Sequence, residues 1–159
     1  MTLTAEQDPF AYFGLPATIR LDRAALDRAY TQKMRAIHPD VVAQDQKAEA
    51  EIEAASCHRA YQQLSGFRSR AEVILRLRGE FSAGKQVPPG FLEEIFSINE
   101  RLEEGEDLLA EAETRVIARR RSIESLLEQN APLSEVRALL NAYIYEENLY
   151  KQCESKEED

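Results

Sequence analysis

Pro39 is the residue that most constrains the fold, because it must end a helix at a fixed point. The residues before it place their apolar side chains at intervals of four, four and three, which predicts an amphipathic helix with one apolar face: Leu26, Tyr30, Met34 and Ile37. Pro39 has no amide hydrogen to donate, and it biases His38 away from the α region. The helix must therefore stop after Ile37, and a short, stiff loop presents the imidazole of His38 and the carboxylate of Asp40.

Helix-capping residues predict where the first two helices begin. Asp8 followed by Pro9 is typical of an N-cap and a first helical residue, so we expect a short helix that runs through Phe13 and ends at Gly14. Asp22 is expected to cap the longer helix that Pro39 ends.

A second long helix should follow the loop, starting at Asp45 or a neighbouring residue and ending at Ser65-Gly66. It carries its own apolar stripe: Cys57, Ala60, Tyr61 and Leu64. One more short helix is expected over residues 69–78, with apolar positions Ala71, Ile74, Leu75 and Leu77.

A break in composition separates the two halves of the chain. Residues 79–90 hold five of the twelve Gly and Pro residues, which predicts a linker. Three long helical segments follow, separated at Gly105 and at Asn130–Pro132: 91–104, 107–129 and 134–154. The middle segment places five apolar residues on one side, so a three-helix bundle is the simple packing solution: Leu109, Ala112, Val116, Ile123 and Leu127. Residues from Glu154 onward are expected to fray.

Composition excludes several classes of protein. No apolar run approaches the length of a membrane span, and residues 1–8 lack the basic and apolar character of a targeting segment. Cys57 and Cys153 belong to no Cys-x-x-Cys pair, so neither a disulfide framework nor a structural zinc site is expected. The prediction is an all-α protein of two small domains in a reducing compartment, without contact to a membrane.

The net charge of −9 is unevenly distributed. Residues 1–89 hold 12 basic and 11 acidic residues, a balance of +1, whereas residues 90–159 hold 8 and 18, a balance of −10. Such an acidic half disfavours nucleic acid as a partner. It is either a solvated surface that aids solubility or a face that steers a basic partner. The helix before Pro39 is instead cationic, and Arg28 and Arg35, seven residues apart, lie on one of its faces.

No catalytic constellation is present in the sequence. There is no Gly-rich phosphate loop, and no Ser or Cys has a recognisable nucleophile motif. His38, Asp40, Cys57 and His58 do not match the spacing of a standard metal site, and Cys57 lies on an apolar stripe, which is typical of a core residue. We therefore expect no enzyme activity, no metal and no cofactor.

These features resemble a known family. A tyrosine eight residues before His38-Pro39-Asp40, followed by a helix that ends in Ala60-Tyr61-x-x-Leu64, is the pattern of J domains. More narrowly, the chain resembles the HscB family of J-type co-chaperones, which act in iron–sulfur cluster assembly. The matching segments are Phe13-Gly14-Leu15-Pro16, Arg70-Ala71-Glu72, Leu77-Arg78-Gly79 and Phe91-Leu92-Glu93-Glu94.

The resemblance implies an architecture and two partners. Residues 1–78 would form the J domain, an antiparallel helix pair with short flanking helices, residues 79–90 the linker, and residues 91–159 a three-helix bundle that binds the scaffold. Such proteins dock onto an HscA-type chaperone, accelerate its ATP hydrolysis, and deliver the IscU-like scaffold protein to it. The implied chaperone-binding residues are His38, Pro39, Asp40, Arg35 and Arg28, and the implied scaffold-binding residues are Leu92, Phe96, Glu100 and Tyr143.

The chain departs from the family pattern at several positions. Val41 stands where a basic residue usually follows the loop motif, and Lys33 stands at a usually apolar position. Glu93 and Ser97 replace a usual apolar and a usual acidic residue near the scaffold-facing stripe. No Cys-x-x-Cys module precedes the J domain, which favours a bacterial-type cytoplasmic protein over one of the mitochondrial matrix.

Three other functions remain open at this point. A general J-domain co-chaperone for another client would need the loop but not Leu92 and Phe96. A non-catalytic helical interaction protein would not need His38, and a small metalloenzyme would hold a bound metal. Without the resemblance, Leu92 and Phe96 can equally be bundle core.

Overall fold

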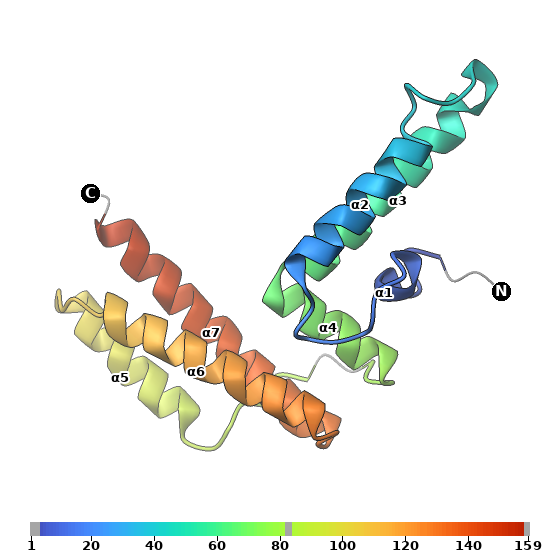
Figure 1. Cartoon of the computed structure of the whole chain (residues 1–159). Coiled ribbons are helices and arrows are strands. Elements are labelled where there is room, and N and C mark those ends of the chain that lie inside the picture. The colour runs from blue at the N-terminus through green and yellow to red at the C-terminus, as the bar shows by residue number, and fades with distance from the viewer. Residues whose placement is uncertain (1–3, 82–83, 158–159) are drawn as a thin grey trace. The chain divides into compact units, whose positions relative to one another are not determined.

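The structure is a computed structural model that describes residues 4–81 and 84–157, all of whose regular elements are helices. The elements in chain order are α1 (Pro9–Tyr12), α2 (Arg23–Ile37), the 3₁₀ helix η1 (Gln44–Gln46), α3 (Lys47–Ser65), α4 (Phe67–Leu77), α5 (Phe91–Glu103), α6 (Leu109–Glu128) and α7 (Leu133–Glu157) (Figure 1). The chain divides into two compact units between Glu80 and Phe81. The all-α prediction is confirmed.

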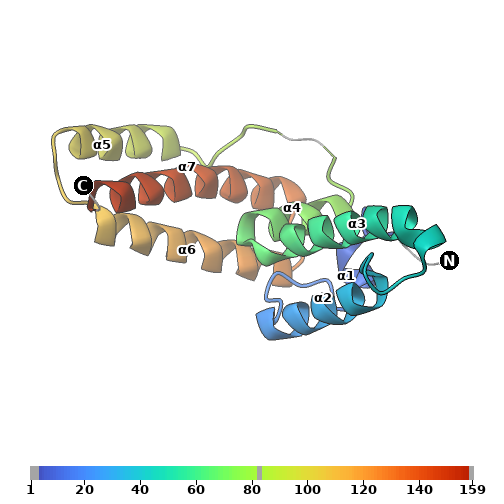
Figure 2. The same cartoon turned by 90° about the horizontal axis from the view of Figure 1, so that it is seen from above.

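The first unit is built on the antiparallel pair of α2 and α3, which lie side by side along their length (Figure 2). Side chains cap the helices where the sequence predicts: an Asp8 carboxylate oxygen accepts the Ala11 amide at 3.1 Å, and an Asp22 carboxylate oxygen accepts the Ala24 amide at 3.0 Å. The long helix α2 ends at Ile37, directly before the loop that contains Pro39.

The core of this unit lies between α2, α3 and α4, with α1 packed on α3. Its fully buried residues include Leu26, Cys57, Leu64, Ala71 and Leu75. Each buried leucine contributes about 1.5–3 kcal/mol relative to an exposed one. The pair is therefore held mainly by apolar burial, so the loop at its end rests on a fixed support.

Arg70 ties three parts of this unit together. Its guanidinium donates to the carbonyl oxygens of Leu64 at 2.7 Å and Ile19 at 2.9 Å. Leu64 lies in the last turn of α3, whose carbonyls lack partners within the helix. Arg70 thus caps α3 and fastens the segment before α2 to α4.

The start of α4 differs from the prediction of residue 69. Gly66 is extended, with φ −91° and ψ 144°, and the helix begins immediately afterwards at Phe67, which is buried. The break at Ser65-Gly66 therefore needs only one non-helical residue. Burial of the Phe67 ring extends α4 by two residues toward its N-terminus.

The predicted linker over residues 79–90 is partly structured. Gly79 has φ +99°, and the Glu80 amide donates to the Leu75 carbonyl at 2.9 Å, so both residues close the end of α4. Asn141 of α7 donates to the carbonyls of Gly84 at 2.7 Å and Gln86 at 2.8 Å. The stretch between these anchored parts is short, and two of its residues, 82 and 83, lie outside the described residues.

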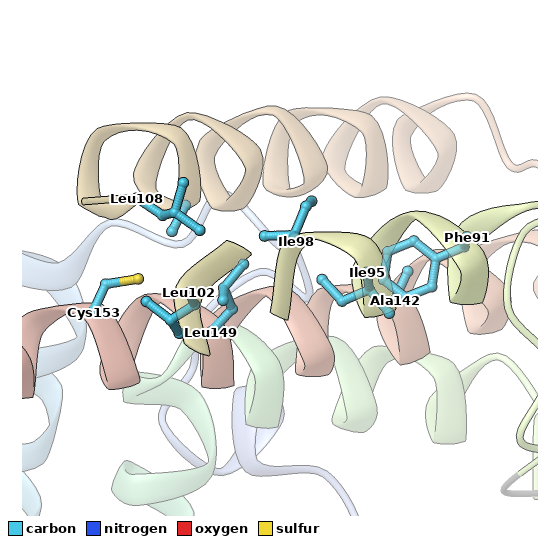
Figure 3. Packing of buried hydrophobic residues seen from close by; sticks show 9 residues of the cluster. Phe91, Ile95, Ile98, Leu102, Leu108, Ala142, Leu149 and Cys153 are labelled. Atoms are coloured by element: carbon cyan, nitrogen blue, oxygen red, sulfur yellow. The ribbon is translucent and has the colours of Figure 1, made fainter. Parts of the chain in front are cut away.

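The second unit is a three-helix bundle. Helices α6 and α7 form its most extensive pair, and α5 packs against α7. Figure 3 shows the apolar cluster that α5 buries, which contains Phe91, Ile95, Ile98 and Leu102 of α5, Leu108 and Ala112 before and within α6, and Ala142, Leu149 and Cys153 of α7. The predicted bundle is confirmed.

Helix α7 continues to Glu157, so the prediction that the chain frays from Glu154 is wrong for residues 154–157. Residues 158–159 lie outside the described part of the chain. Two contacts explain the extension. The Cys153 side chain is buried against α5, and the Lys156 ammonium donates to the Leu102 carbonyl at 3.0 Å. A cation on the last carbonyls of α5 favourably complements the negative end of that helix.

We expect both thiols to be unreactive in the folded protein. Burial raises the pKa of Cys57 and of Cys153, so the nucleophilic thiolate is disfavoured even at mildly alkaline pH. Titration with Ellman's reagent should give negligible reaction in buffer and two thiols per chain in guanidinium chloride. Rapid labelling of the folded chain would mean that α3 or α7 opens locally.

Candidate functional site

The loop after α2 closes on itself through backbone contacts. The His38 amide donates to the Met34 carbonyl at 2.9 Å, which completes the last turn of the helix. His38 is extended, with φ −61° and ψ 136°, as Pro39 requires. The Val41 amide then donates back to the His38 carbonyl at 3.0 Å and forms a tight turn around Pro39 and Asp40. The loop is therefore a single ordered turn.

His38 and Asp40 contact each other within the loop. The His38 Nδ1 atom lies 3.2 Å from the Asp40 amide nitrogen and 3.5 Å from the Asp40 Oδ2 atom. Both side chains are exposed. The loop therefore offers a partner one imidazole and one carboxylate, two residues apart in the sequence.

The basic flank predicted on α2 is exposed. Arg28 and Arg35 face solvent on the same side of the helix, and neither forms an ion pair with any residue that the structure describes. Lys33 is different, because its ammonium lies 4.5 Å from the centroid of the Tyr12 ring. Lys33 thus joins α1 to α2 through a cation–π contact. Val41 is also exposed, beside the charged loop.

A second exposed surface lies on α5. The side chains of Leu92 and Phe96 are 39% and 60% exposed, and Glu100, one turn further on, is exposed as well. The core stripe of this helix is made of other residues, Phe91, Ile95, Ile98 and Leu102. The alternative that Leu92 and Phe96 are bundle core is therefore wrong.

The structure corrects the placement of Tyr143 on this surface. Its side chain is 0% exposed, and its hydroxyl accepts hydrogen bonds from Arg120 of α6 at 2.9 and 3.1 Å. Burial raises the pKa of this phenol. Tyr143 belongs to the interface of α6 and α7 and cannot contact a partner from there.

Tyr145 is an exposed tyrosine of α7, and the sequence reasoning missed it. It is 46% exposed, and its ring meets Phe91 edge to face, with the centroids 5.8 Å apart. Tyr145 follows Ala142 by three residues and precedes Leu149 by four, and both of those residues pack against α5. It therefore borders α5. The only signal in the sequence is that residues two apart on a helix point in nearly opposite directions, so one of the two tyrosines had to be outside.

Leu92 and Phe96 lie on the flank of α5 away from α6, and Tyr145 of α7 meets the start of α5 at Phe91. The opposite flank of that helix faces α6, because Glu94 pairs with Arg115 at 2.7 Å and Arg101 pairs with Glu111 at 3.0 Å. Leu92 is two residues from Glu94, about 200° around the helix, and so faces the α7 flank. We call Leu92, Phe96 and Tyr145 the docking face. Exposed carboxylates of α5 border it: Glu93, Glu100 and Glu103.

The four residues considered as metal ligands do not come together. Cys57 is buried in the helix pair, and His58 Nδ1 lies 3.3 Å from the Tyr30 hydroxyl. Within residues 4–81 and 84–157 no group of three His, Cys, Asp or Glu side chains is placed to hold a metal ion. In the same part of the chain, no helix is long and apolar enough to cross a membrane.

Curated J-type co-chaperones share sequence with the chain, although no family model matches it, and two of them illustrate the likeness. The mitochondrial J-type co-chaperone jac1 of Schizosaccharomyces pombe is 33% identical over 90 residues, which are 55% of this chain and 40% of that protein. The co-chaperone protein HscB homolog of Cupriavidus taiwanensis is 35% identical over 105 residues, 62% of this chain and 60% of that protein. The chain thus spans about half the length of the curated relatives it matches.

Solved HscB structures share the fold over nearly the whole chain, as two of them show. The human co-chaperone protein HscB superposes with a TM-score of 0.82 at 28% identity, covering 94% of this chain and 82% of the human one. The chaperone HscB from Vibrio cholerae gives a TM-score of 0.82 at 22% identity, covering 95% and 98%. At 22% identity the second likeness concerns the fold alone.

The two tyrosines should respond oppositely to truncation. Replacing buried Tyr143 by Ala should lower the free energy of unfolding by about 3–5 kcal/mol, because the cavity and the lost transfer energy add. Replacing exposed Tyr145 by Ala should cost at most about 1 kcal/mol, the value of one aromatic contact. Urea unfolding followed by circular dichroism measures both. Equal losses would contradict the assignment of Tyr143 to the core and Tyr145 to the surface.

Proposed function

We propose that the chain, which resembles HscB co-chaperones in sequence and fold, acts as a J-type co-chaperone of iron–sulfur cluster assembly. It stimulates the ATPase of an HscA-type chaperone and brings an IscU-like scaffold protein to it. The observation that carries the proposal is the pairing of an exposed His38–Asp40 loop on one unit with an exposed apolar face on the other.

The loop is the part that acts on the chaperone. Its turn is held by backbone hydrogen bonds before any partner binds, so little conformational entropy is lost on docking. The His38 imidazole and the Asp40 carboxylate then contact the chaperone directly. The chain itself carries out no chemistry. It accelerates hydrolysis by binding the hydrolysis-competent state of the chaperone more tightly, and each 1.4 kcal/mol of that preference gives about tenfold in rate.

Arg28 and Arg35 steer this encounter. They are exposed cations without ion-pair partners among the described residues, so their field acts on an approaching acidic surface. Flanking charges of this kind mainly change the association rate and lose their effect at high salt. Exposed Val41 adds an apolar contact at the edge of the loop.

The docking face binds the scaffold. Its apolar centre is partly exposed to solvent and consists of Leu92, Phe96 and Tyr145. The exposed carboxylates of α5 form one edge of this face. An interface with this composition fits a partner with an apolar centre and a basic rim. Tyr145 replaces buried Tyr143 as the contribution of α7.

Carrying both surfaces on one chain makes the protein an adaptor. Once the scaffold is bound to one unit and the chaperone to the other, the two partners meet at a high effective concentration. A bacterial-type cytoplasmic location stays a prediction, because the relatives include a mitochondrial and a bacterial protein.

Replacing His38 by Gln should reduce stimulation of the chaperone ATPase by at least about tenfold, a loss of about 1.4 kcal/mol of preference for the active state. The exposed ring supports no core packing, so circular dichroism should not change. The matched control is His58→Gln, which changes the other histidine of the chain and should retain stimulation. Full stimulation by His38→Gln would contradict the J-domain function.

Replacing Leu92 and Phe96 together by Ala should leave stability nearly unchanged, because both side chains are already exposed. Affinity for the scaffold should fall by about 30-fold or more, since an interface hot spot is worth at least about 2 kcal/mol. Thermal melts and isothermal titration with the purified scaffold measure the two quantities.

The matched control for the docking face is Ile117→Ala. Ile117 is an exposed apolar residue of α6 in a groove lined by α6 and α7 alone. It should leave scaffold affinity unchanged. Unchanged affinity in the Leu92→Ala/Phe96→Ala variant, with His38→Gln still inactive, would instead favour a J-type co-chaperone that serves another client.

A further inference from the structure

A buried carboxylate lies where the three helices of the bundle meet. Glu146 of α7 is only 2% exposed. Its Oε1 atom accepts a hydrogen bond from Arg119 Nε at 2.6 Å, and its Oε2 atom lies 3.3 Å from Arg115 Nε. The Arg115 Nε makes no hydrogen bond, so this second contact is an ion pair. Two arginines, one turn apart on α6, thus share one carboxylate of α7.

Both arginines also reach the first turn of α5. The Arg115 Nη1 atom donates to Glu94 Oε1 at 2.7 Å, and the hydrogen bond lowers the pKa of Glu94. The Arg119 guanidinium carbon lies 5.5 Å from the centroid of the Phe91 ring. The network therefore runs from α7 through α6 to Phe91 and Glu94 of α5, which lie one residue before and two residues after Leu92. We call Glu146, Arg115, Arg119, Glu94 and Phe91 the three-helix network.

Stability alone does not account for a carboxylate at this position. Desolvating a charged group is costly, and a well-packed apolar residue at such a site is often as stabilising or more so. What the hydrogen bonds of Arg115 with Glu94 and of Arg119 with Glu146 add is direction, because hydrogen bonds have preferred geometries whereas apolar contacts do not. They therefore define the rotation of α5 about its own axis.

The rotation of α5 decides which apolar residues reach solvent. Phe91 and Leu92 are successive residues, about 100° apart around the helix, and one is buried while the other is exposed. A rotation of a few tens of degrees would turn Leu92 and Phe96 toward or away from α7. Tyr145 is affected as well, because its ring rests on Phe91 and it directly precedes Glu146.

We propose that Glu146 is a positioning residue of the docking face, which acts through Arg115 and Arg119 to set the angle at which α5 presents Leu92 and Phe96. The inference rests on the proposed function, because it assumes that this face binds the scaffold. Glu146 is buried and contacts no partner itself.

The test compares Glu146→Gln with Glu147→Gln. The first keeps the size of the side chain but removes the charge that the two arginines share. The second is the matched control, because Glu147 pairs with Lys151 and contacts the Tyr143 hydroxyl, both on its own helix α7. Titration with the purified scaffold should show an affinity loss of about tenfold for Glu146→Gln and less than about twofold for Glu147→Gln, with chaperone stimulation in the absence of scaffold unchanged in both.

A double-mutant cycle separates positioning from general destabilisation. In a Phe96→Ala background, Glu146→Gln should have much less effect on scaffold affinity, because the side chain that it positions is gone. An undiminished loss in that background would overturn the proposal, as would an affinity for Glu146→Gln within about twofold of wild type. Nuclear Overhauser contacts between the Phe91 and Tyr145 rings provide a structural readout, and they should weaken in Glu146→Gln and persist in Glu147→Gln.

Glu94→Gln keeps the proposal testable if Glu146→Gln does not fold. Glu94 is exposed, so its replacement cuts the network at α5 without disturbing the core. Its affinity loss should be severalfold and should not add to that of Glu146→Gln. Unchanged affinity in Glu94→Gln and an unmoved Phe91–Tyr145 contact would overturn the proposal.

Failure of the proposed function gives a different result. If Leu92→Ala/Phe96→Ala binds the scaffold normally, the docking face is wrong and the positioning role falls with it. If that double variant loses affinity while Glu146→Gln and Glu94→Gln retain it, the docking face stands and only the positioning role is overturned.

Discussion

The His38–Asp40 loop depends on a helix that ends at a fixed residue, and the docking face depends on a helix with a fixed orientation. At Pro39 the missing amide hydrogen ends α2 directly after Ile37, and the His38 and Val41 amides close the turn on the helix end. The antiparallel packing of α2 on α3 holds that end in place. Without the stop, His38 and Asp40 would be two more residues on a helix surface, and their side chains would diverge by about 200°.

The docking face depends on how helix α5 is oriented in the bundle. Helix α5 carries two neighbouring apolar stripes, one buried against α7 and one exposed. Exposed apolar side chains that cluster on one face are typical of binding surfaces. Their exposure is set by the orientation of α5. Arg115 and Arg119 of α6 contact that helix at Glu94 and Phe91, and Glu146 of α7 holds the two arginines. The buried ionic contacts and the exposure of the apolar residues thus both depend on the same orientation of α5.

Charge acts locally in this protein, and the net value of −9 describes neither surface. The cations beside the loop lie on the nearly neutral half, whereas the carboxylates beside the docking face lie on the half that carries −10. The cationic flank of the loop therefore attracts an acidic surface, and the carboxylates beside the docking face attract a basic rim.

The sequence by itself determined the helices, their caps and the loop, because these depend on local chemistry: the missing amide hydrogen of Pro39, the capping carboxylates of Asp8 and Asp22, and the spacing of apolar residues. It did not decide which apolar residues of α5 and α7 are buried. Periodicity identifies an apolar face, but α5 has two adjacent ones, and α7 carries tyrosines at 143 and 145 that point in nearly opposite directions. Only the packing of α5 on α7 placed Tyr143 inside and left Leu92, Phe96 and Tyr145 outside. Contacts between distant residues also anchored the linker through Asn141 and extended α7 through Lys156. Local sequence carries no record of such contacts, because their energy comes from partners more than fifty residues away.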